Sequence, residues 1–182
     1  KTGLTFRAEL ILKFKQGVID RSSEIIDICI NEAGKTKPDA EAELDRALQA
    51  LTHVAGVQHF YPTHFSQNVA GGIDIADLRF PIGVVAGVGP FNFPILIPIL
   101  HSSMALVTGN TYIAKPSEKV PSISRLYADI YEDVGLPNGC FNVINGNKEI
   151  VELLVRHEKV NGLAFIGSTV AAKSLKILGV EH

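Results

Sequence analysis

PIGVVAGVGPFNFP, the segment from Pro81 to Pro94, joins a short apolar run to a glycine-containing turn that opens a helix. After one helix's length, GNTYIAKPSE (Gly109 to Glu118) repeats the order of apolar strand and polar turn. Apolar strands that alternate with helices are typical of a parallel sheet covered on both faces. In such α/β domains, ligands bind beyond the carboxyl ends of the strands. The two segments therefore predict the fold class and the edge of the sheet where a functional site is expected.

The same alternation of apolar runs with glycine, proline and polar residues continues along the chain and predicts a regular series of strands and helices. We expect strands at 82–87, 111–115, 141–144 and 162–166, followed by helices at 95–107, 121–134, 147–156 and 168–178. Before this series, near-helical spacing of apolar residues predicts two helices, one that ends at Gly34 and one that follows Pro38. The buried stripe of the second helix is expected to consist of Ala42, Leu44, Ala47, Leu48, Leu51 and Val54.

The predicted fold class is α/β, a Rossmann-like parallel sheet with helices on both faces that follows an N-terminal helical segment. Residues 1–64 are expected to form the N-terminal helices and residues 81–182 the sheet with its helices. Between them, residues 65–80 alternate around Gly71-Gly72, which predicts a hairpin or extended excursion. We therefore expect three parts along the chain.

Composition limits the classes of partner. The chain has 182 residues, of which 46% are hydrophobic and 20% charged, as in an ordinary globular protein with room for one domain. A formal net charge of -2 offers no basic surface, so no nucleic-acid partner is expected. The longest apolar run, Phe91 to Met104, is broken by prolines and polar residues, so we expect no membrane span. Charges within Lys1 to Asp20 argue against a signal peptide.

The cysteines and histidines give no sign of a disulfide or metal framework. Cys29 and Cys140 lack CxxC spacing and lie among apolar residues, so we expect small buried side chains in a reducing compartment. The cytoplasm is expected, with the mitochondrial matrix as the alternative. His53, His59 and His64 are not spaced to share one helix face, and no metal site is expected.

The turn after the first predicted strand contains a candidate catalytic amide. Gly87 to Asn92 begins like the dinucleotide-binding fingerprint but lacks its third glycine, and taken alone it is more simply explained as a glycine-rich turn from strand to helix. The amide of Asn92 offers two uncharged hydrogen-bond donors, as the oxyanion of a tetrahedral intermediate requires. A helix N-cap is the alternative role for this side chain.

The turn after the second strand contains a lysine and a carboxylate. Pro116 ends the strand and leaves Lys115 and Glu118 in the connection above the sheet edge. A carboxylate at this place can accept both hydroxyls of an adenosine ribose. Alternatively, Ser117 and Glu118 begin a helix.

A glycine and two hydroxyl residues follow the last predicted strand. Gly167, Ser168 and Thr169 open a helix, so backbone N–H groups and the Ser168 hydroxyl are expected to face an anion such as a pyrophosphate. Simple N-capping by Ser168 or Thr169 explains the same residues.

Taken together, GPFNFP, GNTYIAKPSE, GLPNGCFNVINGN and GLAFIGST resemble the aldehyde dehydrogenase superfamily over nearly the whole chain. The resemblance implies NAD(P)-dependent oxidation of a small-molecule aldehyde through a cysteine thiohemiacetal and thioester. It also implies that the nucleophilic cysteine lies in a domain downstream of these residues, so the chain is expected to supply the coenzyme-binding part.

The resemblance assigns roles to particular residues. Asn92 is similar to the oxyanion-stabilising amide, Lys115 and Glu118 to the ribose-binding pair, and Ser168 to the hydroxyl on the pyrophosphate. Phe91 is similar to the wall beside the cofactor, and Gly146 to the glycine beside the adenine. Cofactor contacts are therefore expected from Gly89, Phe91, Lys115, Ser117, Glu118, Gly146, Gly167 and Ser168. The chain departs from the family at Ala172, where a glycine is usual and a methyl group could crowd the cofactor.

The semialdehyde branches of the superfamily are the most similar. SMALVTGNT and GKTKPDA resemble methylmalonate-semialdehyde dehydrogenase, whereas His101 and NGLAFIGS also resemble succinylglutamate-semialdehyde dehydrogenase. In the former branch Arg46 would reach a substrate carboxylate, although a solvated helix residue is the alternative. Glu118 favours NAD, because a carboxylate repels a 2′-phosphate, but Lys115 leaves NADP open.

Two other functions remain open from the sequence. One is a semialdehyde dehydrogenase that passes its thioester to coenzyme A, and the other is a catalytically inactive dinucleotide-binding or scaffold protein. Residues 65–80 resemble the excursion with which the family builds its oligomerisation sheet, so a homo-oligomer, dimer or tetramer, is expected.

Overall fold

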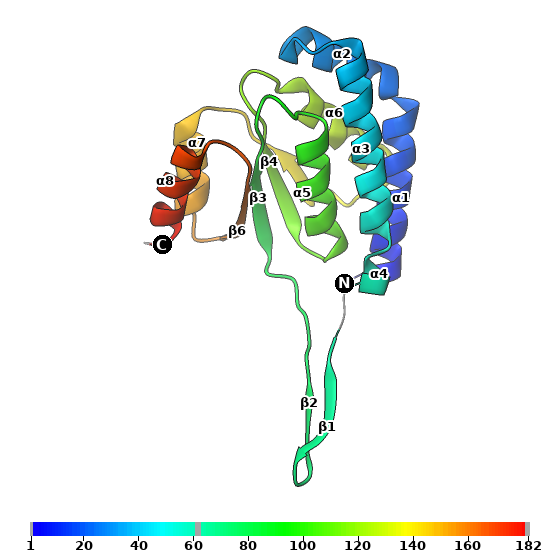
Figure 1. Cartoon of the computed structure of the whole chain (residues 1–182), viewed down its shortest axis with the longest axis vertical. Coiled ribbons are helices and arrows are strands. Elements are labelled where there is room, and N and C mark those ends of the chain that lie inside the picture. The colour runs from blue at the N-terminus through cyan, green and yellow to red at the C-terminus, as the bar shows by residue number, and fades with distance from the viewer. Residues whose placement is uncertain (1, 61–62, 181–182) are drawn as a thin grey trace.

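The computed structural model describes residues 2–60 and 63–180 and consists of a parallel sheet, helices on both of its faces and a projecting hairpin (Figure 1). The helices are α1 (Leu4–Asp20), α2 (Ser22–Ala33), α3 (Lys37–Ala55), α4 (Val57–Phe60), α5 (Leu96–Val107), α6 (Ser122–Asp133), α7 (Lys148–Arg156) and α8 (Thr169–Val180). The strands are β1 (Phe65–Ala70), β2 (Ile73–Ala76), β3 (Val84–Val88), β4 (Thr111–Lys115), β5 (Phe141–Val143) and β6 (Val160–Phe165). Among the described residues, no helix is both long and apolar enough to cross a bilayer.

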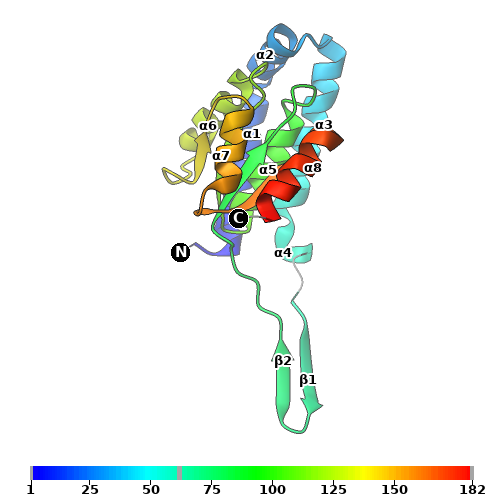
Figure 2. The same ribbon diagram turned by 90° about the vertical axis from the view of Figure 1, so that its left-hand side faces the viewer.

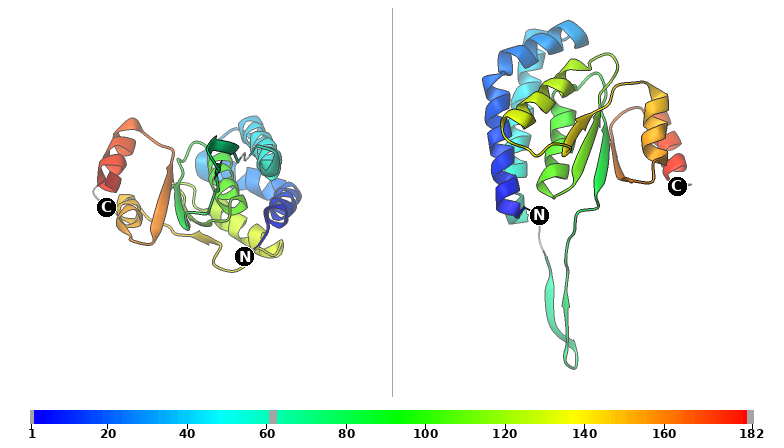
Figure 3. Two further views of the ribbon diagram at one scale, coloured as in Figure 1. Left: turned by 90° about the horizontal axis from the view of Figure 1, so that it is seen from below. Right: turned by 180° about the vertical axis from the view of Figure 1, so that it is seen from behind.

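The sheet reverses its strand order at β3. Its order is β5-β4-β3-β6 and its pairs are all parallel, so the chain moves outward from β3 to β5 and then returns to the other side of β3. Helices α5 and α6 consequently lie on one face of the sheet, and α7 and α8 on the other (Figures 1 and 3). This arrangement confirms the predicted α/β class with helices on both faces, and it creates a switch point between β3 and β6.

The register of the strands brings their carboxyl ends level. Val88 at the end of β3 pairs with Lys115 on one side and with Phe165 on the other. On the outer strand pair, Ala114 of β4 pairs with Val143 of β5. The connections that follow these strands therefore all leave the sheet from the same edge.

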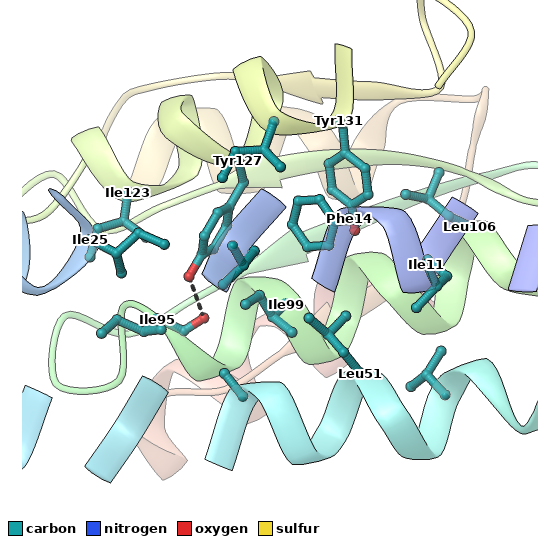
Figure 4. Packing of buried hydrophobic residues seen from close by; sticks show 14 of the residues in the cluster. Ile11, Phe14, Ile25, Leu51, Ile95, Ile99, Leu106, Ile123, Tyr127 and Tyr131 are labelled. Carbon is teal, nitrogen blue, oxygen red and sulfur yellow. Dashed lines mark hydrogen bonds between the residues drawn. The ribbon is translucent and has the colours of Figure 1, made fainter. Parts of the chain in front are cut away.

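The N-terminal helices share one core with the sheet. The ring of Phe14 in α1 stacks on that of Tyr131 in α6, with 3.7 Å between their centroids. The Tyr127 hydroxyl donates a hydrogen bond of 3.1 Å to the carbonyl oxygen of Ile95 at the start of α5 (Figure 4). These side chains are almost completely buried, so the N-terminal helices contribute directly to the packing of α5 and α6.

The N-terminal helices differ from the prediction at two points. The expected helix up to Gly34 is interrupted at Arg21, which leaves the helical conformation (φ -105°, ψ 19°) and allows α2 to contact α3 and α6. Gly34 ends α2, as predicted, and it does so in the left-handed conformation. Ala42 is exposed, so its place in the buried stripe of α3 was wrong, and Ala40 and Glu43 are buried there instead.

The hairpin predicted at 65–80 is present and projects away from the helices and sheet (Figure 2). Strands β1 and β2 pair antiparallel, and Gly72 takes the positive φ of 80° that the turn between them requires. The apolar side chains exposed on this segment are Phe65, Val69, Ile73, Ile75, Leu78 and Phe80. The hairpin thus exposes apolar side chains on a segment that projects from the rest of the structure.

Two motif residues serve the fold rather than a ligand. The Asn110 side-chain oxygen accepts hydrogen bonds from the N–H groups of Ile82 (2.8 Å) and Gly83 (3.1 Å), which fixes the start of β3. A Cβ atom at Gly87 would overlap the hydroxyl of Tyr112 from the neighbouring strand. Glycine is therefore needed at position 87 for strand packing.

Both cysteines are free thiols, and they differ in accessibility. Cys29 is 0% exposed, and burial together with the nearby Glu43 carboxylate raises its pKa to about 11. Cys140, at the turn before β5, is half-buried, so the expectation of a buried side chain was wrong for this residue. Since the reactive form of cysteine is the thiolate, Cys29 is unsuited to nucleophilic chemistry at neutral pH.

We expect iodoacetamide at pH 8 to modify Cys140 while leaving Cys29 unmodified in the folded protein. The reason is that Cys29 is inaccessible and that pH 8 lies about three units below its raised pKa of about 11, so its thiol stays protonated. Peptide mass spectrometry after timed alkylation measures both sites, and the same reaction in denaturant is the control in which both should react. Rapid labelling of Cys29 without denaturant would contradict its burial in the core.

Candidate active site

The loop between β3 and α5 presents Asn92 to solvent. Helix α5 starts at Leu96 with Ile95 as its N-cap residue, so Asn92 lies before the helix and does not cap it. Its side chain is exposed and makes no hydrogen bond with any other described residue. The N-cap alternative is therefore wrong, and the amide is available to a ligand.

Two phenylalanines flank Asn92, and each is contacted by a lysine from another segment. The Lys119 ammonium lies 4.5 Å from the ring centroid of Phe91, which joins the loop after β3 to the loop after β4. On the other side, the Lys35 ammonium lies 4.8 Å from the ring centroid of Phe93. These cation–π contacts place the Asn92 loop between the β4 connection and the N-terminal helices.

The last residue of β4 carries a buried ammonium group, and the connection that follows carries an exposed carboxylate. The side chain of Lys115 is 5% exposed, and its ammonium nitrogen lies 3.5 Å from the Glu118 carboxylate, which is itself 63% exposed. No second partner of this ammonium is found among the described residues. Because an ammonium group has three donors and is costly to bury unpaired, this geometry is suited to a ligand that accepts the remaining hydrogen bonds.

Ser117 and Glu118 form a turn rather than the start of a helix. Helix α6 begins at Ser122, and the Ser117 hydroxyl oxygen accepts a hydrogen bond of 3.3 Å from the N–H of Lys119. The helix-start alternative is therefore wrong. A hydrogen bond from its own backbone N–H lowers the pKa of Glu118, the ammonium groups of Lys115 and Lys119 lower it further, and partial desolvation opposes them. Glu118 is thus ionised at neutral pH and accepts hydrogen bonds only.

The connection after β6 begins helix α8 with a serine cap. The Ser168 hydroxyl oxygen accepts a hydrogen bond of 3.3 Å from the N–H of Ala171, so the capping alternative is correct for this residue. Its own O–H remains available as a donor, and Gly167 and Ser168 are both exposed. Capping and anion binding are therefore compatible at this helix end.

Gly146 and Gly89, the other two glycines predicted to contact the cofactor, differ in whether a side chain would fit at their positions. A Cβ atom at Gly146, which follows β5 with a φ of 149°, would overlap the side chain of Ile150. One at Gly89 would meet only ordinary contacts, the nearest at 3.8 Å from Ile97. Packing thus explains glycine at position 146 and leaves Gly89 without a steric reason.

Most of the predicted residues gather along one edge of the sheet. Phe91 and Asn92 adjoin the Lys115–Glu118 turn through Lys119, whereas Gly167 and Ser168 follow β6 on the opposite side of β3. Gly146 follows the outer strand β5 and is the furthest from β6 in the order of the sheet. Arg46, considered for a substrate carboxylate, is exposed on α3.

A cavity of about 630 Å³ lies elsewhere, between α7, β6 and α8. None of the predicted site residues lines it, although Ala172 does. The candidate site is therefore an open rim along the carboxyl ends of the strands.

Two carboxylates of the N-terminal helices were not predicted from the sequence. Glu43, only 3% exposed, accepts hydrogen bonds of 2.8 Å from the N–H groups of both Ile95 and Leu96 at the start of α5. Glu32 accepts hydrogen bonds from the N–H and the hydroxyl of Ser122 at the start of α6. For Glu43 the sequence did contain a sign of burial. It lies three residues after Ala40 and four before Ala47, which places it on the same buried face of α3.

Comparison with known proteins agrees with this architecture. The sequence model of the aldehyde dehydrogenase family matches residues 1–178. A malonate-semialdehyde dehydrogenase of Bacillus pumilus is 33% identical over 182 residues, which cover 100% of this chain and 37% of that protein. The human mitochondrial methylmalonate-semialdehyde/malonate-semialdehyde dehydrogenase [acylating] is 34% identical over 181 residues, which cover 100% of this chain and 34% of that protein.

Solved structures show the same fold. A methylmalonate-semialdehyde dehydrogenase of Oceanimonas doudoroffii is 35% identical with a TM-score of 0.96, covering 100% of this chain and 37% of that one. A structure described as a methylmalonate-semialdehyde dehydrogenase of Sinorhizobium meliloti 1021, complexed with NAD, is 34% identical with a TM-score of 0.95, covering 99% and 37%. The chain spans about a third of the length of these relatives. Since the family model matches almost every residue, the chain belongs to the aldehyde dehydrogenase family.

Proposed function

We propose that this chain supplies the coenzyme-binding part of an NAD-dependent dehydrogenase that oxidises a semialdehyde to an acid through a cysteine thioester. The observation that carries the proposal is the buried Lys115 ammonium beside the exposed, ionised Glu118, next to the free amide of Asn92. The relatives named above support it, because they are described as semialdehyde dehydrogenases and one is complexed with NAD.

The residues present fit NAD. Each ribose hydroxyl both donates and accepts a hydrogen bond, so Lys115 can donate to the diol while the Glu118 carboxylate accepts from it. The free O–H of Ser168 and the N-terminus of α8 suit a pyrophosphate. The negative charge of Glu118 disfavours a 2′-phosphate, which supports NAD over NADP. When bound, NAD accepts the hydride that leaves the substrate.

Asn92 is proposed to stabilise the oxygen of the aldehyde as it becomes tetrahedral. Its N–H groups would donate to the developing negative charge, a contribution of roughly 2.7–4 kcal/mol to the barrier. The attacking thiol is expected from neither cysteine of this chain. Cys29 is buried and its pKa is raised to about 11, and Cys140 precedes β5 and so lies at the opposite edge of the parallel sheet from Asn92. We therefore propose that the nucleophile is a cysteine outside these 182 residues. It would lie in a region that corresponds to the part of the relatives, roughly two thirds of their length, that this chain does not cover.

A second function differs in the acceptor of the acyl group. The human relative carries the description "acylating", which favours transfer of the thioester to coenzyme A instead of water. The coenzyme-binding residues serve both reactions equally. Substrates of malonate-semialdehyde type are proposed in either case, by the descriptions of the relatives.

We propose that the hairpin of β1 and β2 joins copies of the protein into a dimer or tetramer. Its exposed apolar side chains and the marginal stability of an isolated hairpin in water support this role. A cytoplasmic location is proposed because both thiols are free, with the mitochondrial matrix as the alternative. The human relative is described as mitochondrial.

Asn92→Ala should lower kcat for semialdehyde oxidation by roughly 10²–10³-fold while leaving NAD affinity unchanged, because it removes an oxyanion donor and no coenzyme contact. Steady-state kinetics of the protein expressed from its complete gene measure kcat, and calorimetric titration measures NAD binding. Asn138→Ala, at an exposed asparagine in the turn before β5, is the matched control. An unaltered kcat in Asn92→Ala would show that Asn92 takes no part in the reaction.

Lys115→Met should weaken NAD binding by roughly 1.5–3 kcal/mol, or tenfold and more, because charge-assisted hydrogen bonds to the ribose are lost. Glu118→Gln should also weaken NAD but improve the relative affinity for NADP. Titration calorimetry with both coenzymes gives these constants, and Glu9→Gln at an exposed position of α1 should change neither. NAD affinities equal to wild type in both variants would place the nucleotide elsewhere.

A further inference from the structure

A buried carboxylate from the N-terminal helices holds the helix that follows the Asn92 loop. We propose that Glu43 is a positioning residue for Asn92, acting through the first turn of α5 and through Lys35. The inference rests on the proposed function, since it assigns Asn92 to the oxyanion. It adds a role for residues that lie outside the candidate site itself.

The first turn of α5 depends on Glu43 for its hydrogen bonds. The N-cap residue of this helix is Ile95, whose side chain cannot accept a hydrogen bond. One carboxylate oxygen of Glu43 accepts instead from the N–H groups of Ile95 and Leu96, each at 2.8 Å. The carboxylate also opposes the positive end of the helix dipole. Glu43 thus serves as a cap supplied by a different helix.

The peptide group of Ile95 is held from both sides. Its N–H donates to Glu43, and its carbonyl oxygen accepts from the Tyr127 hydroxyl at 3.1 Å (Figure 4). Asn92 lies only three residues earlier, and the intervening Pro94 restricts the backbone. A shift of Ile95 would therefore be transmitted to the Asn92 amide.

Lys35 provides a second connection to the loop. Its ammonium lies 2.5 Å from the other carboxylate oxygen of Glu43 and 4.8 Å from the ring centroid of Phe93, the neighbour of Asn92. The ion pair compensates the cost of burying the Glu43 charge. Glu43 therefore reaches the loop along the backbone and, through Lys35, along a side chain.

Glu32 offers a matched comparison within the same chain. It accepts hydrogen bonds from Ser122 at the start of α6, and so caps the helix after the Lys115–Glu118 turn. Loss of this cap should disturb coenzyme binding more than turnover. Loss of the Glu43 cap should do the reverse, since α5 follows the Asn92 loop.

The test compares Glu43→Ala, Glu43→Asp and Glu43→Gln in the protein expressed from its complete gene. Gln keeps the side-chain length and one acceptor oxygen of Glu43. Asp keeps the negative charge, but its side chain is one methylene group shorter and so holds the carboxylate further from the N–H groups of α5. We expect kcat to fall roughly 10–100-fold in Ala and Asp, with KM for NAD little changed. It should fall less in Gln, which keeps an acceptor for the N–H groups of Ile95 and Leu96 but loses the ion pair with Lys35. Val54→Ala, at a buried position of α3, is the control for lost stability, and its kcat should stay near wild type at a temperature where it is folded.

A second readout does not depend on activity. Amide hydrogen exchange at Ile95 and Leu96 should be roughly tenfold faster in Glu43→Ala or Glu43→Asp than in wild type, and unchanged in Glu32→Ala. If wild type oxidises no semialdehyde, the proposed function fails, and exchange alone decides whether Glu43 holds the loop.

The inference is overturned by either of two results. One is a kcat in Glu43→Asp no lower than in Val54→Ala, and the other is unaltered exchange at both amides. Should Glu43→Ala not fold, the contrast between Asp and Gln decides the matter. A kcat no lower in Asp than in Gln would then overturn the inference, because the reach of the side chain to the N–H groups of Ile95 and Leu96 would not be what the site requires.

Discussion

The parallel pairing of β3 with both β4 and β6 is the constraint on which the candidate site depends. Because Val88 pairs with Lys115 and with Phe165, three strands end at one level and their connections begin together. The predicted site residues then follow within three or four positions: Asn92 after β3, Glu118 after β4, Gly146 after β5 and Ser168 after β6. A strand shifted by one residue would reverse the faces of its side chains and move its connection away from the others. Sheet register thus determines which side chains can share a ligand.

The N-terminal helices complete this arrangement from outside the sheet. Glu43 caps α5 and Glu32 caps α6, the two helices that follow the loops with Asn92 and with Lys115 and Glu118. Burying a carboxylate is costly unless it is paired, and here the cost is offset by backbone N–H groups and by Lys35. The helices before the hairpin therefore stabilise the site, although only Arg46 among their residues was considered for contact with a ligand.

The sequence predicted the sheet well because its strands are apolar runs bounded by glycine, proline and polar residues, and their ends differ from the structure by at most two positions. The break at Arg21 escaped prediction, since apolar spacing continues across it and no glycine or proline marks it. Glu43 escaped because a glutamate in an amphipathic helix is normally exposed, and its partners lie about fifty residues away in the chain. For Ser168, residue type could not separate capping from anion binding, because one hydroxyl can do both.

A crystal structure of the protein expressed from its complete gene, grown with NAD, tests the central claim most directly. The claim is that the level strand ends bring Lys115, Glu118 and Ser168 to one nucleotide. The account predicts ribose hydroxyls within about 3.2 Å of the Lys115 ammonium and the Glu118 carboxylate, and a pyrophosphate at the start of α8. A nucleotide bound in the cavity between α7, β6 and α8, away from these side chains, would contradict it.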